Sequence, residues 1–124
     1  MANNPAQKLG NMLGLARKAG KLAYGTERVL ECIRSKRPRL VLAAADISEN
    51  TRKRLVNCCT HYSGEYGYKI EYIELELTMD ALSHYVGQRG SVSSVCLEDK
   101  GFTDAVRKLI GSTDDGARVA PQEV

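Results

Sequence analysis

The residues from Leu40 to Ala45 are all apolar and directly follow Pro38 and Arg39. A run of this length is typical of a strand, and a strand that is apolar on both faces must be covered on both faces. We therefore expect residues 39–45 to form a central strand with helices packed on either side of its sheet.

Short strand-like runs alternate along the chain with segments of helical periodicity. Strands are expected at 21–24, 39–45, 70–77 and 91–97. Helices are expected at 8–19, 25–35, from Asp46 or Ser48 to Gly64 or Gly67, 78–87 and 101–110. This alternation predicts a layered α/β/α domain with a small sheet. We expect a single domain at 8–110 and a disordered, polar and acidic tail at 111–124.

Positive charge is concentrated in the first part of the chain. Residues 1–54 hold 12 Lys and Arg against 4 Asp and Glu, whereas residues 55–124 hold 6 against 11. Such asymmetry is compatible with a polyanionic partner, although charge bias taken alone favours two solvated faces without a ligand. The sequence contains neither a secretory signal nor an apolar run of the roughly 20 residues that span a bilayer, so we expect a cytoplasmic protein without membrane contact.

Residue patterns for catalysis, metal binding or nucleotide binding are absent from the sequence. The four cysteines form no C-x-x-C pair, and Cys58 and Cys59 are adjacent on an expected helix, so buried thiols are favoured over a metal corner. The sequence contains no G-x-G-x-x-G motif and no P-loop. His61 and His84 each lie beside a tyrosine on an expected helix, which favours a surface or packing role over that of a general base. We expect no cofactor, no metal and no enzymatic activity.

Glycines Gly10 and Gly14 lie inside the first expected helix. Their spacing places both on one helix face, which favours close packing against a neighbouring helix over a ligand loop.

The segment from Leu13 to Thr26 predicts an anion-binding edge. Gly25 and Thr26 begin a helix, whose first backbone N–H groups are unpaired and attract anions. Three nearby cations would attract a polyanion: Arg17, Lys18 and Lys21. The loops at 46–48 and 87–92 are expected at the same end of the sheet, although 87–92 is also compatible with a plain turn.

Five motifs together resemble a known family. They are Leu13–Lys21, Gly25-Thr26, Arg39–Asp46, Ser48–Thr51 and Asp99–Phe102. The chain resembles, over residues 8–110, the kink-turn RNA-binding ribosomal proteins of the L-seven-Ae and L-thirty-e type, and within them the small stand-alone bacterial YlxQ-like branch.

The resemblance implies a three-layer α/β/α sandwich around a four-stranded mixed sheet. It further implies a monomeric RNA-binding protein that grips a sharply bent RNA, either ribosomal or kink-turn-like, with a ribosomal or translation protein as a possible neighbour. By position, the helix start contributes Gly25, Thr26, Glu27, Arg28 and Glu31. The loop Gln88–Ser93 contributes Arg89, the apolar Val92, and Ser93.

Three positions at the helix start differ from the pattern of the RNA-binding members, and in the loop Gly90-Ser91 stand where those members often have Arg-Pro, with Arg89 one place early. Glu27, Arg28 and Glu31 stand where those members have asparagine, glutamate and lysine. An acid at position 31 repels phosphate, whereas Arg28 can bind guanine O6 and N7. The mixed charge also fits a second hypothesis, in which the same fold is a protein-interaction module without kink-turn specificity.

Overall fold

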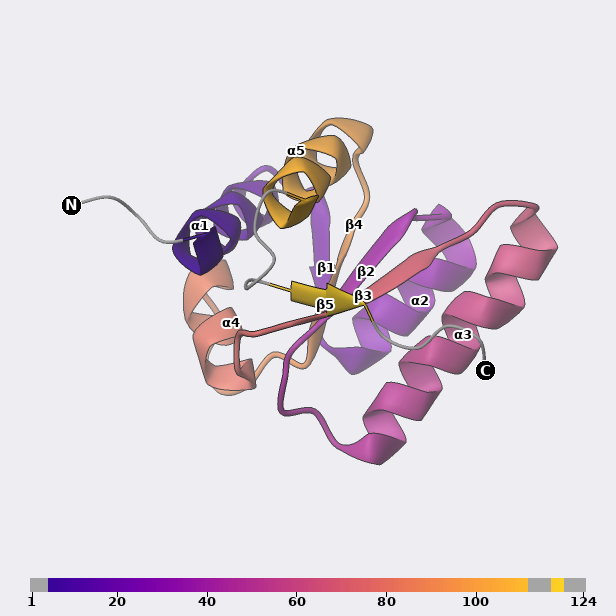
Figure 1. The fold of residues 1–124 in the computed structure, drawn as a ribbon, viewed down its shortest axis with the longest axis horizontal. Helices are drawn as coiled ribbons and strands as arrows, with labels where there is room; N and C mark the ends of the chain where they lie inside the picture. The colour runs from indigo at the N-terminus through magenta and orange to yellow at the C-terminus, as the bar shows by residue number, and fades with distance from the viewer. Residues whose placement is uncertain (1–4, 112–116, 120–124) are drawn as a thin grey trace.

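The computed structural model describes residues 5–111 and 117–119 (Figure 1). Its helices are α1 (Pro5–Lys18), α2 (Thr26–Lys36), α3 (Glu49–Tyr66), α4 (Met79–Val86) and α5 (Lys100–Gly111). Its strands are β1 (Leu22–Tyr24), β2 (Leu40–Ala43), β3 (Glu71–Leu75), β4 (Ser94–Leu97) and β5 (Ala117–Val119). Each helix and strand expected from the sequence is present, with ends that differ by a few residues.

The strands form one mixed sheet in the order β1-β4-β2-β3-β5. Strand β2 runs parallel to β3, and β4 runs antiparallel to both β2 and β1. All four residues of β2 are buried, because β4 and β3 flank it and helices cover both of its faces. The expectation of a central strand is therefore confirmed.

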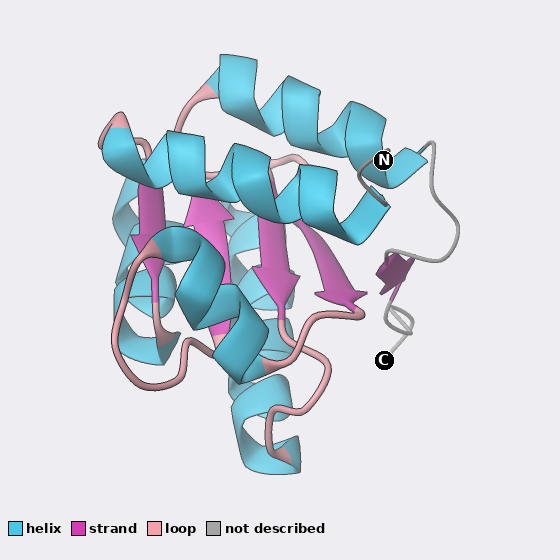
Figure 2. Cartoon of the chain, turned by 90° about the vertical axis from the view of Figure 1, so that its left-hand side faces the viewer, coloured by secondary structure: helices cyan, strands magenta, loops and turns pink. Residues whose placement is uncertain are grey.

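Helices cover the sheet on two sides. Helix α1 packs against α4 and α5, whereas α2 packs against α3. Figure 1 shows these two groups on opposite sides of the strands, and Figure 2 shows the strands running between them. The three-layer α/β/α arrangement and the four-stranded mixed sheet β1-β4-β2-β3 are confirmed.

Strand β5 adds a fifth strand that the sequence did not predict. It pairs antiparallel with β3 at the sheet edge and places Val119 opposite Ile73. A segment of three residues is too short to show the alternation of apolar and polar side chains by which strands are recognised. The tail predicted at 111–124 otherwise lies outside the described residues, apart from Gly111 at the end of α5.

Helices α1 and α4 make close contact through glycine. A Cβ atom added at Gly10 would lie 2.5 Å from ring atoms of Tyr85, and one at Gly14 would lie 2.6 Å from the Tyr85 carbonyl oxygen. Only glycine leaves room for this approach. The interpretation of these two glycines as helix-packing residues is confirmed.

The choice between Asp46 and Ser48 as the cap of α3 is resolved in favour of Ser48. The Ser48 hydroxyl accepts a hydrogen bond from the Thr51 backbone N–H at 3.1 Å. The Asp46 carboxylate instead accepts one from the Met79 backbone N–H at 2.8 Å. Asp46 thereby ties the loop after β2 to the start of α4.

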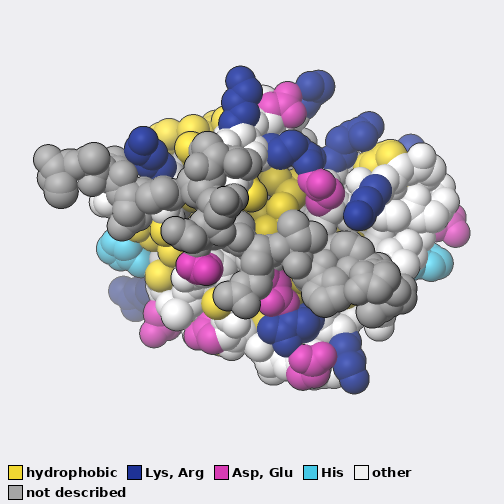
Figure 3. Space-filling model, viewed as in Figure 1, with side chains coloured by type: hydrophobic (Ala, Val, Ile, Leu, Met, Phe, Trp, Pro, Cys, Tyr) yellow, Lys and Arg dark blue, Asp and Glu magenta, His cyan; other side chains and the backbone are white. Residues whose placement is uncertain are grey.

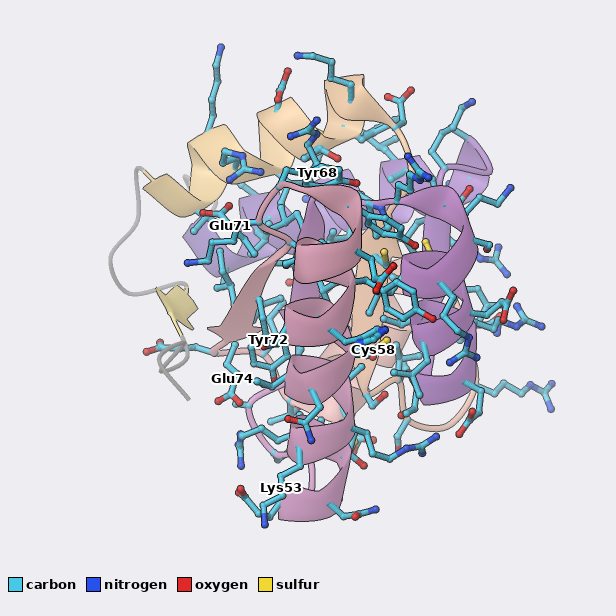
Figure 4. All side chains as sticks on the ribbon, turned by 90° about the vertical axis from the view of Figure 1, so that its right-hand side faces the viewer. Lys53, Cys58, Tyr68, Glu71, Tyr72 and Glu74 are labelled. Carbon is cyan, nitrogen blue, oxygen red and sulfur yellow. The ribbon has the colours of Figure 1, made fainter. Side chains whose placement is uncertain are left out.

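The acids on β3 are paired with arginines from the helices. Glu74 forms an ion pair with Arg52 of α3, and Glu71 forms one with Arg107 of α5. The Tyr72 hydroxyl also donates to Glu74 at 3.0 Å, and burial together with this carboxylate raises the pKa of Tyr72. Figure 4 shows Glu71, Tyr72 and Glu74 along β3 beside α3. These glutamates join the sheet to both helix layers.

The cysteines are free thiols inside or at the border of the core. Cys32, Cys59 and Cys96 are buried, whereas Cys58 is half-buried. Burial raises the pKa of Cys59 to about 12, which keeps this thiol protonated at neutral pH. The expectation of buried or half-buried thiols is confirmed.

Candidate nucleic-acid interface

The N-terminus of α2 is open because the residue that precedes it is a glycine. Gly25 has a φ of 90°, which favours glycine, and it offers no side chain to accept from the first turn. Helices α3 and α4 differ, because the hydroxyls of Ser48 and Thr78 accept from their first turns. The start of α2 therefore leaves backbone N–H donors free for an anion.

The loop before β4 is fixed beside this helix start. The Thr26 and Ser93 hydroxyl oxygens lie 2.7 Å apart in a hydrogen bond. The Gly25 N–H donates to the Ser94 carbonyl oxygen, and the Ala44 N–H donates to the Ser93 carbonyl oxygen. The helix start, the end of β2 and the loop at 87–93 thus meet at one end of the sheet, as the sequence predicted.

A shallow groove of about 320 Å³ lies between the helix start and the loop. It is lined by Tyr24, Gly25, Thr26, Glu27, Arg28, Gln88, Arg89, Ser91 and Val92. Most of the predicted site residues line the groove. Ser93 does not line it but is hydrogen-bonded to Thr26, which does. An open groove of mixed polarity suits the surface of a macromolecule better than a small substrate.

Tyr24 organises the cations of the groove, and the sequence reasoning did not identify it. The guanidinium carbon of Arg28 lies 4.9 Å from the Tyr24 ring centroid, and that of Arg17 lies 5.5 Å away. Arg17 also donates to the Gln88 side-chain oxygen at 3.0 Å. Hydrogen bonding to Arg17, followed by the charge of Arg28, lowers the pKa of Tyr24. Its position directly before Gly25 and Thr26 was the signal in the sequence from which Tyr24 could have been identified.

The two acids on α2 are paired with arginines of the protein itself. The Glu27 carboxylate lies 2.8 Å from an Arg54 nitrogen, and the Glu31 carboxylate lies 3.3 Å from an Arg34 nitrogen. Glu27 lines the groove, whereas Glu31 lies outside it in a neighbouring hollow between α2 and β1. These pairs partly neutralise the negative charge at the helix start.

Two further predicted residues, Lys18 and Lys21, lie outside the groove, and a third, Val92, is buried beneath it. Lys21 is at the other end of β1 from Gly25, where its carbonyl oxygen accepts from the Glu98 N–H. Lys18 ends α1 and does not line the groove. Val92 lines the groove but is only 3% exposed, because it belongs to the core. Its side chain therefore forms the floor of the groove.

Within residues 5–111 and 117–119, no three His, Cys, Asp or Glu residues gather closely enough to hold a metal ion. Over the same part of the chain, no helix has the length and apolar character needed to cross a bilayer.

The chain is similar to proteins of one known family. Residues 7–106 match the model of the ribosomal protein L7Ae/L30e/S12e/Gadd45 family. The chain is 32% identical over 99 residues to a protein of Bacillus subtilis (strain 168) named RNA-binding protein YlxQ, covering 80% of this chain and 91% of that protein. A protein of the same name from Enterococcus faecium is 32% identical over 105 residues, covering 84% and 92%.

Two solved structures have a similar fold. A protein of unknown function from Bacillus halodurans C has a TM-score of 0.67 and 25% identity, covering 84% of this chain and 97% of that one. The Giardia lamblia 15.5kD RNA binding protein has a TM-score of 0.63 and 14% identity, covering 92% of each. With the family model matched over most of its length, this chain belongs to the ribosomal protein L7Ae/L30e/S12e/Gadd45 family.

Proposed function

We propose that this protein binds structured RNA without catalysing a reaction, and that it grips the RNA at the groove between the α2 N-terminus and the loop at 87–93. The observation that carries the proposal is the uncapped start of α2, held beside that loop by the bond between Thr26 and Ser93. Free backbone N–H groups beside stacked arginines form a site for phosphate oxygens.

Each side chain of the groove has a proposed role. Arg28 reaches a base edge or a phosphate from its position above Tyr24, and Arg17 adds a second cation. Arg89 contributes charge from the facing loop, and Val92 gives the groove an apolar floor. The family membership and the names of the YlxQ relatives support an RNA ligand over other polyanions.

The proposal includes the finer expectations drawn from the sequence. The RNA is sharply bent, of the kink-turn kind, and belongs to the ribosome or to another structured RNA. The protein acts as a cytoplasmic monomer. The intramolecular pairing of Glu27 and Glu31 supports this proposal, because it reduces the repulsion that these acids would exert on phosphates.

The bond between Thr26 and Ser93 offers a selective test. Thr26→Val keeps the shape of the side chain but removes the hydroxyl, so the loop loses its attachment to α2 and RNA affinity is expected to fall about fivefold to tenfold. Thr26→Ser keeps the hydroxyl and is expected to bind nearly as well as the natural protein. Fluorescence anisotropy with a labelled kink-turn RNA measures both affinities.

Two results would contradict an RNA site in this groove. Equal affinities for the Thr26→Val and Thr26→Ser proteins would contradict the groove as the RNA site. If a defined protein remained bound to the natural chain after nuclease treatment and was released by Thr26→Val, the groove would instead be a protein-binding site.

A further inference from the structure

We propose that the protein has a second RNA-contact surface at the other end of the sheet, which binds phosphates of single-stranded RNA that flanks the primary site. This surface, named here the Arg–Tyr surface, consists of Lys36, Arg37, Arg39, Tyr66, Tyr68 and Lys69. The inference rests on the RNA-binding function proposed above, but it concerns different residues and can fail separately.

Two arginines of this surface are held in place by stacking on tyrosine rings. The Arg37 guanidinium carbon lies 4.8 Å from the Tyr66 ring centroid, and that of Arg39 lies 4.1 Å from the Tyr68 ring centroid. The two tyrosine rings are themselves stacked, with centroids 5.9 Å apart and planes inclined by 29°. Stacking limits the motion of both guanidiniums while their edges keep N–H donors for phosphate oxygens.

The backbone of Arg37 is strained. Its φ of 52° and ψ of 54° place it in the left-handed region, and it is the one non-glycine residue there among those described. Glycine usually occupies this position after a helix because a side chain there costs free energy. Arg37 is held by the Tyr68 hydroxyl, which donates to its carbonyl oxygen at 2.5 Å. Non-glycine residues held in strained backbone conformations cluster at functional sites.

The cations of the Arg–Tyr surface are exposed and have no acidic partner. Arg37 and Arg39 form no ion pair within the described ranges, and the same holds for Lys36 and Lys69. This contrasts with the arginines that pair with glutamates elsewhere, such as Arg52 and Arg107. Charges without partners at a surface attract a polyanion more strongly than paired ones.

Neighbouring acids limit the surface on the side of α5. A hollow between α5 and the two arginines, Arg37 and Arg39, is also lined by Glu98, Asp99 and Asp104. Asp104 pairs with Lys100, and Asp99 accepts from the Phe102 backbone N–H, whereas Glu98 makes no ion pair in the described part of the chain. We therefore place the RNA path over the stacked arginines toward α3, away from this hollow.

The Arg–Tyr surface and the primary groove lie at opposite ends of the sheet. Residues 37–39 precede β2, whereas Ala44, which follows β2, is bonded to the loop beside α2. Figure 4 shows Lys53 near one end of α3 and Tyr68, which follows α3, near the other end. In Figure 3, Lys and Arg side chains are more numerous along the upper and upper-right edges of the molecule than along the lower edge, with Asp or Glu side chains between some of them. A four-residue strand spans about 13 Å, so one RNA must extend beyond the groove to reach both surfaces.

The test compares three RNAs. They are a minimal kink-turn RNA, the same RNA extended by a single strand of about 15 nucleotides, which is near the upper limit for one single-strand binding groove, and that single strand alone. The natural protein is compared with Arg37→Gln/Arg39→Gln, with Arg28→Ala, and with Lys8→Gln as a control. Lys8 is an exposed cation of α1, in the helix layer on the other side of the sheet.

The extended RNA is expected to bind the natural protein on the order of tenfold more tightly than the minimal RNA. The double variant should lose this gain and the binding of the single strand, while its affinity for the minimal RNA stays unchanged. Its salt slope on the extended RNA should fall by about 1.4, which corresponds to two phosphate contacts on a single strand. Arg37→Gly relieves the backbone strain and should fold at least as stably, but it should lose part of the gain.

Two results would overturn the inference. The first is equal affinity of the natural protein for the minimal and extended RNAs. The second is a double variant that keeps the full gain in affinity, which would show that Arg37 and Arg39 do not contact the RNA and would make a protein the better candidate for this surface. A third result separates the two proposals. If the double variant lost single-strand binding while Arg28→Ala changed nothing, the Arg–Tyr surface would stand and the primary groove would fall.

Discussion

Replacing Arg28 with alanine is expected to lower the affinity for kink-turn RNA about tenfold, which lies within the usual range for loss of one arginine contact to a base edge. Arg28 lines the groove and stacks on Tyr24, so its guanidinium is already positioned when RNA arrives. The stability of the fold should change little because the Arg28 side chain is exposed. Anisotropy titrations and thermal unfolding measure the two effects.

Lys8→Ala is the matched control for Arg28→Ala. It also removes one exposed cation, but from α1, about three helical turns before the end of that helix. If both variants lost affinity equally, general charge attraction rather than a specific contact by Arg28 would explain the binding.

Replacing Gly14 with alanine is expected to destabilise the protein by about 2 kcal/mol or more. The new Cβ would lie 2.6 Å from the backbone carbonyl oxygen of Tyr85, so α1 and α4 must separate. Overpacking of this kind typically costs about 1–3 kcal/mol, and separation of the helices also weakens their remaining contacts. Urea unfolding followed by circular dichroism measures the change in the free energy of unfolding.

Gly64→Ala provides the opposite result in the same experiment. Gly64 lies inside α3, and an added Cβ would meet no atom within 4 Å. Alanine is the better helix former by about 1 kcal/mol, so this substitution should stabilise the protein. Equal stabilisation by both substitutions would show that α1 and α4 do not pack closely at Gly14.

The sequence predicted the layers of the fold because their signals are local and strong. The uninterrupted apolar run at Leu40–Ala45 required a central strand, and periodic apolar residues required helices around it. Strand β5 was missed because its pairing with β3 depends on contact between segments far apart in the sequence. The pairing of Asp46 with α4 was missed for the same reason.

The sequence predicted which helix start and loop form the candidate site, but it did not predict all of the side chains that meet there. Gly25 and Thr26 are recognisable as a helix start, and their hydrogen bonds to residues 93 and 94 agree with the predicted edge. Tyr24 was missed because its role depends on Arg17 and Arg28, which approach it from two helices. Lys21 was assigned to the edge by its place in the sequence, but β1 carries it to the other end of the sheet.

The central claim is that the groove at the start of α2 binds a bent RNA. The most direct measurement is the affinity of the purified protein for a labelled kink-turn RNA across a salt series, beside an RNA whose kink has been disrupted by changed bases. We predict tight binding to the intact RNA, weak binding to the disrupted one, and a slope of log affinity against log salt of about −2 to −3, as about three phosphate contacts require. Equal binding to both RNAs, or an affinity that does not change with salt, would contradict the claim.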